Sequence, residues 1–190
     1  RVFEPELCRE LIQLFEQNET YDSGFMLEKD GRTVGLLDHS FKRRRDHEIT
    51  DEQVLQATVV RIHDRLVPEI DKAFGFHATR IERYLVCCYE ATTSDHFHPH
   101  RDNTTKSTVH RRFAVSIFLN PGEYEGGDVR FPEFGSKTYR AATGGAVVFS
   151  CSLLHEVVPM ISGRRFAFLP FLYDDAAAEL RDANLRFLEQ

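Results

Sequence analysis

The feature that most constrains the fold is a series of short strand-like segments that begins near Arg80. Gly or Pro separates most of these segments, and each is rich in apolar, β-branched or aromatic residues. Many short strands at this spacing are typical of a sandwich or barrel, because each sheet needs a second layer to bury its apolar face. The sequence therefore predicts a two-sheet core made from residues 81–89, 113–120, 128–131, 137–141, 146–150, 153–158 and 165–173.

Helical patterns precede this core. Apolar residues recur at helical spacing after Pro5, which suits a first helical position. Thr50 and Gln53 have the form of a capping box for a second helix that ends at Gly75. Pro68 is expected to kink or break this helix, because a proline ring collides with the preceding turn.

A hairpin and a terminal helix complete the predicted elements. Residues 25–27 and 33–37 indicate two strands joined by the Asp30-Gly31 turn, and the Ala-rich tail indicates a helix. Helices followed by strands favour an α+β chain. We expect a double-stranded β-helix (jelly roll) with N-terminal supporting helices and a C-terminal helix. At 190 residues it should form one domain, with helical support over 1–79, a jelly-roll core over 80–174 and the last helix over 175–190.

Charge and cysteine content narrow the function. A formal net charge of −6 argues against general nucleic-acid binding, which needs a basic surface. The one basic run, Lys42 to Arg45, is flanked by acids, so we expect a solvated loop there, with docking of an anionic substrate or partner as the alternative.

No apolar stretch reaches the length of a membrane span, so we expect no membrane partner. The four cysteines lack C-x-x-C spacing, which favours a reduced, cytoplasmic chain. Because the sequence opens on Arg1 rather than methionine, we expect residues upstream and a longer chain.

Three residues form a candidate metal site. His100 and Asp102 are separated by one residue, and His155 could complete the set from a later segment. Two imidazoles and one carboxylate on one face of a metal are the facial triad that suits non-haem Fe(II). The pair His98 and His100 would also suit a cupin-like or zinc site, although the carboxylate that a cupin needs a few residues later is missing.

Several weaker motifs occur in a fixed order around this set, and together they carry a resemblance. The segment from Arg80 to Asp174 resembles the 2-oxoglutarate and Fe(II)-dependent dioxygenases, specifically the prolyl 4-hydroxylase-like branch. The matching motifs are Tyr89, His100-x-Asp102-Asn103, Phe118-Leu-Asn120, Glu125-Gly-Gly-Asp128, the Gly-Gly-Ala-Val-Val-Phe run that ends at Phe149, His155-Glu-Val-x-Pro159, and Arg165 ten residues after His155.

The resemblance implies the cofactors and the reaction. Fe(II) would be held by His100, Asp102 and His155, with 2-oxoglutarate as cosubstrate, O2 as the oxidant and ascorbate as an optional further cofactor. An unactivated C–H bond would be hydroxylated while 2-oxoglutarate is converted to succinate and CO2. No catalytic residue is expected beyond the metal ligands.

Arg165 is the expected partner of the distal carboxylate of 2-oxoglutarate, because a planar guanidinium can make two parallel hydrogen bonds to a carboxylate. Arg164 is the rival, and since successive strand residues face opposite ways, only one of the two can point inward. Relatives often carry a tyrosine at the position of Phe118, so Ser116 or Tyr89 is the candidate that supplies the missing hydroxyl.

The same motifs separate subclasses but leave the substrate open. Halogenating relatives lack the carboxylate that Asp102 provides, and the demethylases of nucleic acids usually carry a second arginine where this chain has Pro170 and Phe171. A prolyl residue, another protein side chain, a free amino acid or a small natural product all remain as substrates. We expect selection by the loops over 90–99 and 103–112 and by the hairpin over 26–36. A non-enzymatic metal-binding module is the alternative function.

Overall fold

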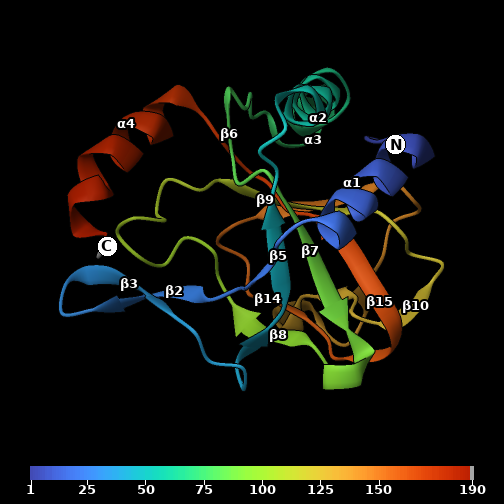
Figure 1. Cartoon of the computed structure of the whole chain (residues 1–190). Coiled ribbons are helices and arrows are strands. Elements are labelled where there is room, and N and C mark those ends of the chain that lie inside the picture. Colours follow the sequence, from blue (N-terminus) through green and yellow to red (C-terminus); the bar gives the residue numbers. More distant parts are fainter. Residues whose placement is uncertain (189–190) are drawn as a thin grey trace.

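The computed structural model describes residues 1–188, and the end of the predicted C-terminal helix, residues 189–190, lies outside this part. The described chain contains α-helices, two large β-sheets and a separate hairpin (Figure 1). Its helices are α1 (Pro5–Gln17), α2 (Glu52–Arg65), α3 (Val67–Phe74) and α4 (Asp175–Asn184). None of these helices is long and apolar enough to cross a membrane.

The two sheets form the predicted double layer. The 9-stranded sheet has the order β1 (Tyr21–Asp22), β5 (Arg45–Glu48), β7 (Leu85–Glu90), β15 (Met160–Phe168), β9 (Phe113–Phe118), β16 (Phe171–Tyr173) and β6 (Arg80–Glu82), with β10 (Tyr124–Gly126) on β15 and β13 (Ala146–Ser150) on β9. The 5-stranded sheet has the order β12 (Thr138–Tyr139), β11 (Val129–Arg130), β14 (His155–Val157), β8 (His96–His100) and β4 (Lys42–Arg43).

The larger sheet is buried on both faces. Along β15, Phe166 and Phe168 point toward the helices, where the rings of Phe15 and Phe3 lie 5.4 and 5.5 Å away between centroids. Ala167, between them, belongs to the apolar cluster that fills the space between the two sheets. This alternation follows from the pleat of a strand, which sends successive side chains to opposite faces.

Helices α1, α2 and α3 lie together on one side of the larger sheet (Figure 1). The predicted break in the second helix is confirmed: α2 ends at Arg65, and Pro68 occupies the first turn of α3, which ends at the left-handed Gly75. The predicted capping box is wrong. Asp51, not Thr50, is the N-cap, because its carboxylate accepts hydrogen bonds from the N–H groups of Gln53 and Val54.

The prediction that residues 1–79 provide helical support and one hairpin left out three further strands. Strands β1, β4 and β5 come from this segment, with β5 pairing with β7 and β4 with β8. The basic run therefore is not a solvated loop: Lys42 and Arg44 are both buried. Arg44 binds the nearby Asp46, but Ser23 and Gly24, which bind Lys42, come from another segment that the local charge pattern does not reveal.

The predicted hairpin is confirmed as β2 (Phe25–Lys29) and β3 (Arg32–Leu36). Asp30 and Gly31 have φ angles of 50° and 76°, the paired left-handed residues of a type I′ turn. The hairpin lies beside the C-terminal end of the chain, where Thr33 forms a bridge with Leu188 (Figure 1).

Several strand boundaries differ from the prediction. The expected strand over 165–173 is two strands, because Pro170 cannot donate a ladder hydrogen bond, and β15 starts five residues earlier, at Met160. Part of the expected loop over 90–99 is β8, whose histidines and proline give no apolar alternation. The C-terminal helix is shorter than predicted, since α4 ends at Asn184 and continues only as a 3-10 turn.

Candidate active site

The three candidate metal ligands meet between the two sheets. His100 on β8 and His155 on β14 are direct cross-strand partners. The Nε2 atoms of His100 and His155 lie 3.5 and 3.3 Å from the two carboxylate oxygens of Asp102. First-row metals bind N and O donors at about 2.0–2.2 Å, so donors on one face of a metal are about 3 Å apart. The three side chains thus converge at nearly the spacing that a metal needs.

Both imidazoles have their Nε2 lone pairs available. The Nδ1 of His100 donates to the carbonyl of His98 at 2.8 Å, and the Nδ1 of His155 donates to the carbonyl of Leu153 at 3.0 Å. A backbone bond at one ring nitrogen fixes the tautomer and presents the other nitrogen as a ligand. The ring of Phe97 stacks on His100 with centroids 3.4 Å apart, which holds the orientation of that imidazole.

Burial sets the protonation of the site. Burial lowers the pKa of His155 to about 4, despite the attraction of Asp102, so this imidazole is neutral at pH 7. Burial opposes ionisation of Asp102, but His155, His100 and Arg111 outweigh it and hold the pKa of Asp102 below its usual value. A neutral imidazole beside an ionised carboxylate is the state in which these groups bind a metal.

Asp102 does not lie on the same strand as His100. Strand β8 ends at His100, and the chain turns so that the N–H of Asp102 donates to the carbonyl of Cys151 at 2.9 Å. The carbonyl of Asp102 accepts a 3.5 Å hydrogen bond from Arg111. The position of this carboxylate therefore depends on a residue that lies far along the chain.

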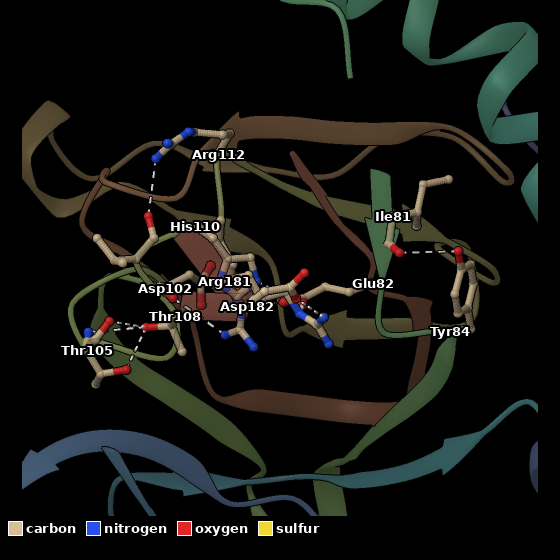
Figure 2. A network of polar contacts seen from close by, with 12 residues as sticks. Ile81, Glu82, Tyr84, Asp102, Thr105, Thr108, His110, Arg112, Arg181 and Asp182 are labelled. Carbon is tan, nitrogen blue, oxygen red and sulfur yellow. Dashed lines mark hydrogen bonds and ion pairs between the residues drawn. The ribbon is translucent and has the colours of Figure 1, made fainter. Parts of the chain in front are cut away.

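A network of polar side chains around Glu82 is linked to Asp102 through Arg111 (Figure 2). Glu82 accepts hydrogen bonds from Arg111 at 2.6 Å and from His110 at 3.0 Å, and Arg181 of α4 lies 3.6 Å from it. Burial would raise the pKa of Glu82, but His110 and Arg111 outweigh it and lower the pKa to about 2. Arg111 thus links an ionised Glu82 to the backbone of the candidate ligand.

Arg165 and Arg164 face opposite ways. Arg165 is 1% exposed and its guanidinium lies 5.1 Å from the ring centroids of both Tyr89 and Phe118. Arg164 points outward and forms a 2.7 Å ion pair with Glu16 on the surface. Of the two arginines, only Arg165 is in a position to contact a ligand near the metal site.

The guanidinium of Arg165 is only partly satisfied. Its Nη2 donates to the hydroxyl of Ser116 at 2.8 Å, but Nε and Nη1 are buried without a partner in residues 1–188. A buried donor that lacks an acceptor is costly, so this group is suited to bind an anionic ligand. An anion beside Arg165 would satisfy these donors.

The six predicted site residues line one cavity: Tyr89, His100, Asp102, Ser116, His155 and Arg165. Tyr89 and Ser116 come from β7 and β9 of the larger sheet, whereas the two histidines come from the smaller one. The Tyr89 hydroxyl accepts a 3.4 Å hydrogen bond from Arg44. The space between Arg165 and the metal ligands is therefore continuous.

Sequence reasoning missed Tyr124, which starts β10. Its hydroxyl is buried and, within the described chain, has no hydrogen-bond partner. Burial raises the pKa of Tyr124 against the opposing effect of the nearby Arg165, so the hydroxyl is protonated and can donate. The sequence signal near Tyr124 was the Gly126-Gly127 pair, which indicates a close approach of the backbone to another group. In the structure this group includes Arg165, whose side chain would lie 3.2 Å from a Cβ on Gly127.

The other histidines near the site are exposed or contact other protein groups. His98 is exposed, His96 contacts the backbone carbonyls of Ser94 and Ser40, and His110 pairs with Glu82. Across residues 1–188, His100, Asp102 and His155 are the one group of three or more such side chains whose donor atoms lie within 4.8 Å of one another. The geometry thus favours the His-Asp-His set over one built on the His98 pair.

Comparison with known proteins supports the same interpretation. Residues 84–173 match the model of the 2OG-Fe(II) oxygenase superfamily. A PKHD-type hydroxylase of Azoarcus sp. (strain BH72) is 32% identical over 105 residues, which make up 52% of this chain and 44% of that protein. The chain therefore spans less than half the length of this relative.

Solved structures confirm the fold. A prolyl-4-hydroxylase of Pseudomonas putida superposes with a TM-score of 0.65 at 15% identity, over 91% of this chain and 89% of that one. A prolyl hydroxylase of Trichoplax adhaerens, in complex with a peptide fragment of the hypoxia inducible factor oxygen degradation domain, gives a TM-score of 0.63 at 17% identity, over 94% and 81% of the two chains. The predicted jelly roll and the predicted resemblance are both confirmed.

Proposed function

We propose, from the premise that residues 84–173 belong to the 2OG-Fe(II) oxygenase superfamily, that this chain is an Fe(II)- and 2-oxoglutarate-dependent dioxygenase that hydroxylates a C–H bond. The observation that carries the proposal is one cavity in which His100, Asp102 and His155 converge beside a buried, partly unsatisfied Arg165. Metal ligands and an anion site in one cavity are what a reaction between iron and a 2-oxo acid requires.

The residues present fit the metal. His100 and His155 would each bind Fe(II) through Nε2, and Asp102 would bind through one carboxylate oxygen. Three protein ligands on one face leave positions for a bidentate 2-oxo acid and O2. The backbone bonds to the two Nδ1 atoms keep both rings in the ligating tautomer.

The residues also fit 2-oxoglutarate. The free Nε and Nη1 of Arg165 would donate to the distal carboxylate of 2-oxoglutarate. The remaining nitrogen, Nη2, is held in place by its hydrogen bond to Ser116. Tyr124, whose buried hydroxyl lies near Arg165, would supply the second donor that relatives provide from a tyrosine at the position of Phe118. Tyr89 would instead cover the guanidinium with its ring, since Arg44 already donates to its hydroxyl.

With iron and 2-oxoglutarate bound, the site would oxidise an unactivated C–H bond while the cosubstrate yields succinate and CO2. The chain's own contribution is geometric and electrostatic. Arg165 and its partners orient the cosubstrate, and the apolar cluster between the sheets limits the access of water. The adjoining loops and hairpin β2–β3 would select the substrate, a residue of a peptide or a small molecule.

A reducing, cytoplasmic location is also part of the proposal. All four cysteines are free and buried, including the adjacent Cys87 and Cys88. Burial raises the pKa of Cys88 above its ordinary value, so its thiol is protonated and unreactive. Free thiols of this kind are typical of proteins from reducing compartments.

The test compares His155→Ala with His98→Ala, a control on the neighbouring strand whose side chain is exposed. Mn(II) binding and 2-oxoglutarate-dependent succinate release, with ascorbate in the assay, are measured against a panel of peptides and small molecules. We expect loss of both signals in His155→Ala and retention in His98→Ala. Stoichiometric iron binding without any succinate would instead identify a non-enzymatic metal-binding module.

A further inference from the structure

We propose that the large cavity beside the metal ligands binds a substrate that carries a carboxylate, and that Lys42 and Arg83 hold this carboxylate. The inference rests on the proposed function, which places the reaction at the metal ligands. It deepens that function by naming the chemical class of the substrate, which the superfamily alone does not define.

The cavity has a volume of about 990 Å³, and His100 and Asp102 form part of its wall. This size lies at the upper end for small-molecule sites, so it can hold more than one amino acid. Hairpin β2–β3 and neighbouring strands provide apolar walls, among them Phe25, Met26 and Phe97. A substrate would thus place an apolar part on these walls and extend toward the metal ligands.

Lys42 is a buried cation in the wall of this cavity. It is 3% exposed, and its Nζ donates to the hydroxyl of Ser23 at 2.7 Å and to the carbonyl of Gly24 at 2.5 Å. Nζ also lies 4.8 Å from the ring centroid of Phe97, which stacks on His100. An ammonium group has three donors, so one remains for a ligand close to the metal site.

The ion pairs of the described chain include no carboxylate within 4.0 Å of the Lys42 ammonium. Burial, and next the charge of Arg44, lower the pKa of Lys42 well below its usual value. Arg83 lowers this pKa further, whereas Asp46 opposes the shift. A carboxylate in the cavity would stabilise the protonated form of Lys42.

Arg83 lies where the large cavity meets the cavity of the metal ligands and Arg165, and it lines both. Its φ angle of 66° is unusual for a residue other than glycine. Backbone strain of this kind clusters at binding sites, where the surrounding structure fixes it. Its guanidinium lies 5.2 Å from the ring centroid of Phe171 and makes no hydrogen bond to any residue in the described part of the chain.

One carboxylate, Asp46, lies among Lys42, Arg44 and Arg83, and Lys42 is linked to it only through the hydroxyl of Ser23. Arg44 binds it with two hydrogen bonds of 2.6 Å, and Ser23 donates a third of 2.5 Å. Arg83 is therefore left 3.7 Å from Asp46, beyond hydrogen-bonding distance. When all three are charged, the group has two positive charges in excess, which an anion in the cavity would balance.

The other acids that line the cavity form no ion pair with Lys42 or Arg83, and one of them, Asp102, belongs to the metal site. Asp22 contacts His39 at 3.2 Å, and Glu28 accepts a hydrogen bond from the backbone of Lys106 at 3.2 Å. Glu48 lies on the exposed end of β5. These acids therefore do not neutralise the cations in the interior of the cavity.

The basic residues at the edge are paired as well. Arg101 pairs with Glu133 at 2.8 Å and Arg111 with Glu82 at 2.6 Å. Lys42 and Arg83 are therefore the cations best placed to bind an anion. The two parallel N–H groups of a guanidinium can bind both oxygens of a carboxylate, and the ammonium adds a third donor. A phosphate group would engage the same donors, so the test includes a phosphorus probe.

Binding of matched probes tests this inference without turnover. The chain is loaded with Mn(II) and 2-oxoglutarate under nitrogen, and calorimetry measures its affinity for 4-phenylbutyrate and 4-phenylbutyramide. A second pair is the peptide acetyl-Leu-Phe-Glu-amide and its Gln counterpart, and 3-phenylpropylphosphonate is the phosphorus probe. We expect at least one acid to bind about tenfold or more tightly than its amide, because a charge-assisted hydrogen bond is lost in the amide.

A preference for 4-phenylbutyrate over its amide would identify the substrate as a free acid. A preference for the Glu peptide over the Gln peptide would identify it as an acidic group of a peptide. Lys42→Met and Arg83→Gln should each reduce the preference for the acid about tenfold, whereas Arg43→Met should retain it. Arg43 lies next to Lys42 on the same strand, but its side chain bonds the exposed carbonyl of Thr93 and lies outside the cavity. Retained Mn(II) stoichiometry shows that a variant is folded.

Equal affinity for acid and amide in the unaltered chain would overturn the inference, as would the absence of any acid binding at millimolar concentration. Tighter binding of the phosphonate than of the acids would overturn the assignment to a carboxylate. The proposed function fails separately, through absence of the 2-oxoglutarate charge-transfer band with Fe(II) or of succinate. Acid discrimination without these signals would leave a carboxylate-binding site in a chain that is not an oxygenase.

Discussion

Arg165→Met should strip the cosubstrate site of its charge while leaving the metal site intact. Arg165 is 1% exposed and donates to no other described side chain than Ser116, so its Nε and Nη1 are free for a ligand. Removing one partner of a buried charge pair costs about 2–5 kcal/mol. Since each 1.4 kcal/mol is tenfold, affinity for 2-oxoglutarate should fall about 30-fold to a few thousandfold.

The matched control is Arg164→Met, one residue earlier on the same strand. Arg164 forms an ion pair with Glu16 at the surface, where such pairs contribute little, so affinity should change less than about threefold. The assay is an anaerobic titration of 2-oxoglutarate into the Fe(II)-loaded protein, followed by the metal-to-ligand charge-transfer band. Mn(II) stoichiometry of both variants verifies that the metal site is intact.

The result that refutes the reasoning is a larger loss of affinity in Arg164→Met than in Arg165→Met. Equal and small losses would show that neither arginine contacts the cosubstrate. In that case the unsatisfied donors of Arg165 would need a different anion, and the assignment of the cavity to 2-oxoglutarate would be wrong.

The remaining predictions concern the groups around these ligands. Tyr124→Phe should weaken 2-oxoglutarate binding about tenfold to a hundredfold in the same titration, because a hydrogen bond to a charged group contributes about 1.5–3 kcal/mol; unchanged affinity would remove Tyr124 from the site. Glu82→Gln should lower the free energy of unfolding by about 1–3 kcal/mol at pH 7 in urea titrations. Because the pKa of Glu82 falls from 4.5 to about 2 on folding, this stabilisation is present above pH 4.5 and lost toward pH 2, and a pH-independent difference would contradict it. Gly127→Ala should destabilise the fold by about 1–3 kcal/mol, since its φ is +65° and a Cβ would collide with Met160 Sδ and lie 3.2 Å from Arg165 Cδ. Gly122→Ala, with open space around it, should be tolerated, and equal melting temperatures would refute this.

The core strands could be predicted because their environment is the same on both faces. Residues 85–90 and 113–118 are buried in nearly every position, between the helices and the second sheet, and such strands are continuously apolar in sequence. The alternation of facing on β15 followed from the same geometry, so the sequence already restricted the inward position to Arg164 or Arg165. The ten-residue offset from His155 favoured Arg165, and the structure places Arg165 inward and Arg164 at the surface.

The metal ligands could be proposed from spacing, but their arrangement could not. His100 and His155 are cross-strand neighbours only because β8 and β14 pair in a specific register. Asp102 approaches them through a backbone hydrogen bond to Cys151, 49 residues later. Local sequence contains no information on that contact. Tyr124 was missed for a similar reason, since a buried hydroxyl without a partner is visible only in three dimensions.

The largest difference from the sequence-based prediction is that Lys42 and Arg44 of the basic run are buried, and this burial has a physical cause. A run of Lys and Arg beside acids normally stays solvated, because taking a charge out of water costs several kcal/mol. Here Ser23 and Asp46 provide hydrogen bonds to Lys42 and Arg44, and these bonds offset part of the cost. The offset is incomplete, since Asp46 bears one negative charge beside the cations Arg44 and Arg83, so at least one positive charge of this group is in excess even when Lys42 is neutral. A fold that retains such an excess beside a large cavity is expected to gain stability when an anion enters, so a carboxylate substrate should raise the melting temperature of this chain in proportion to its affinity.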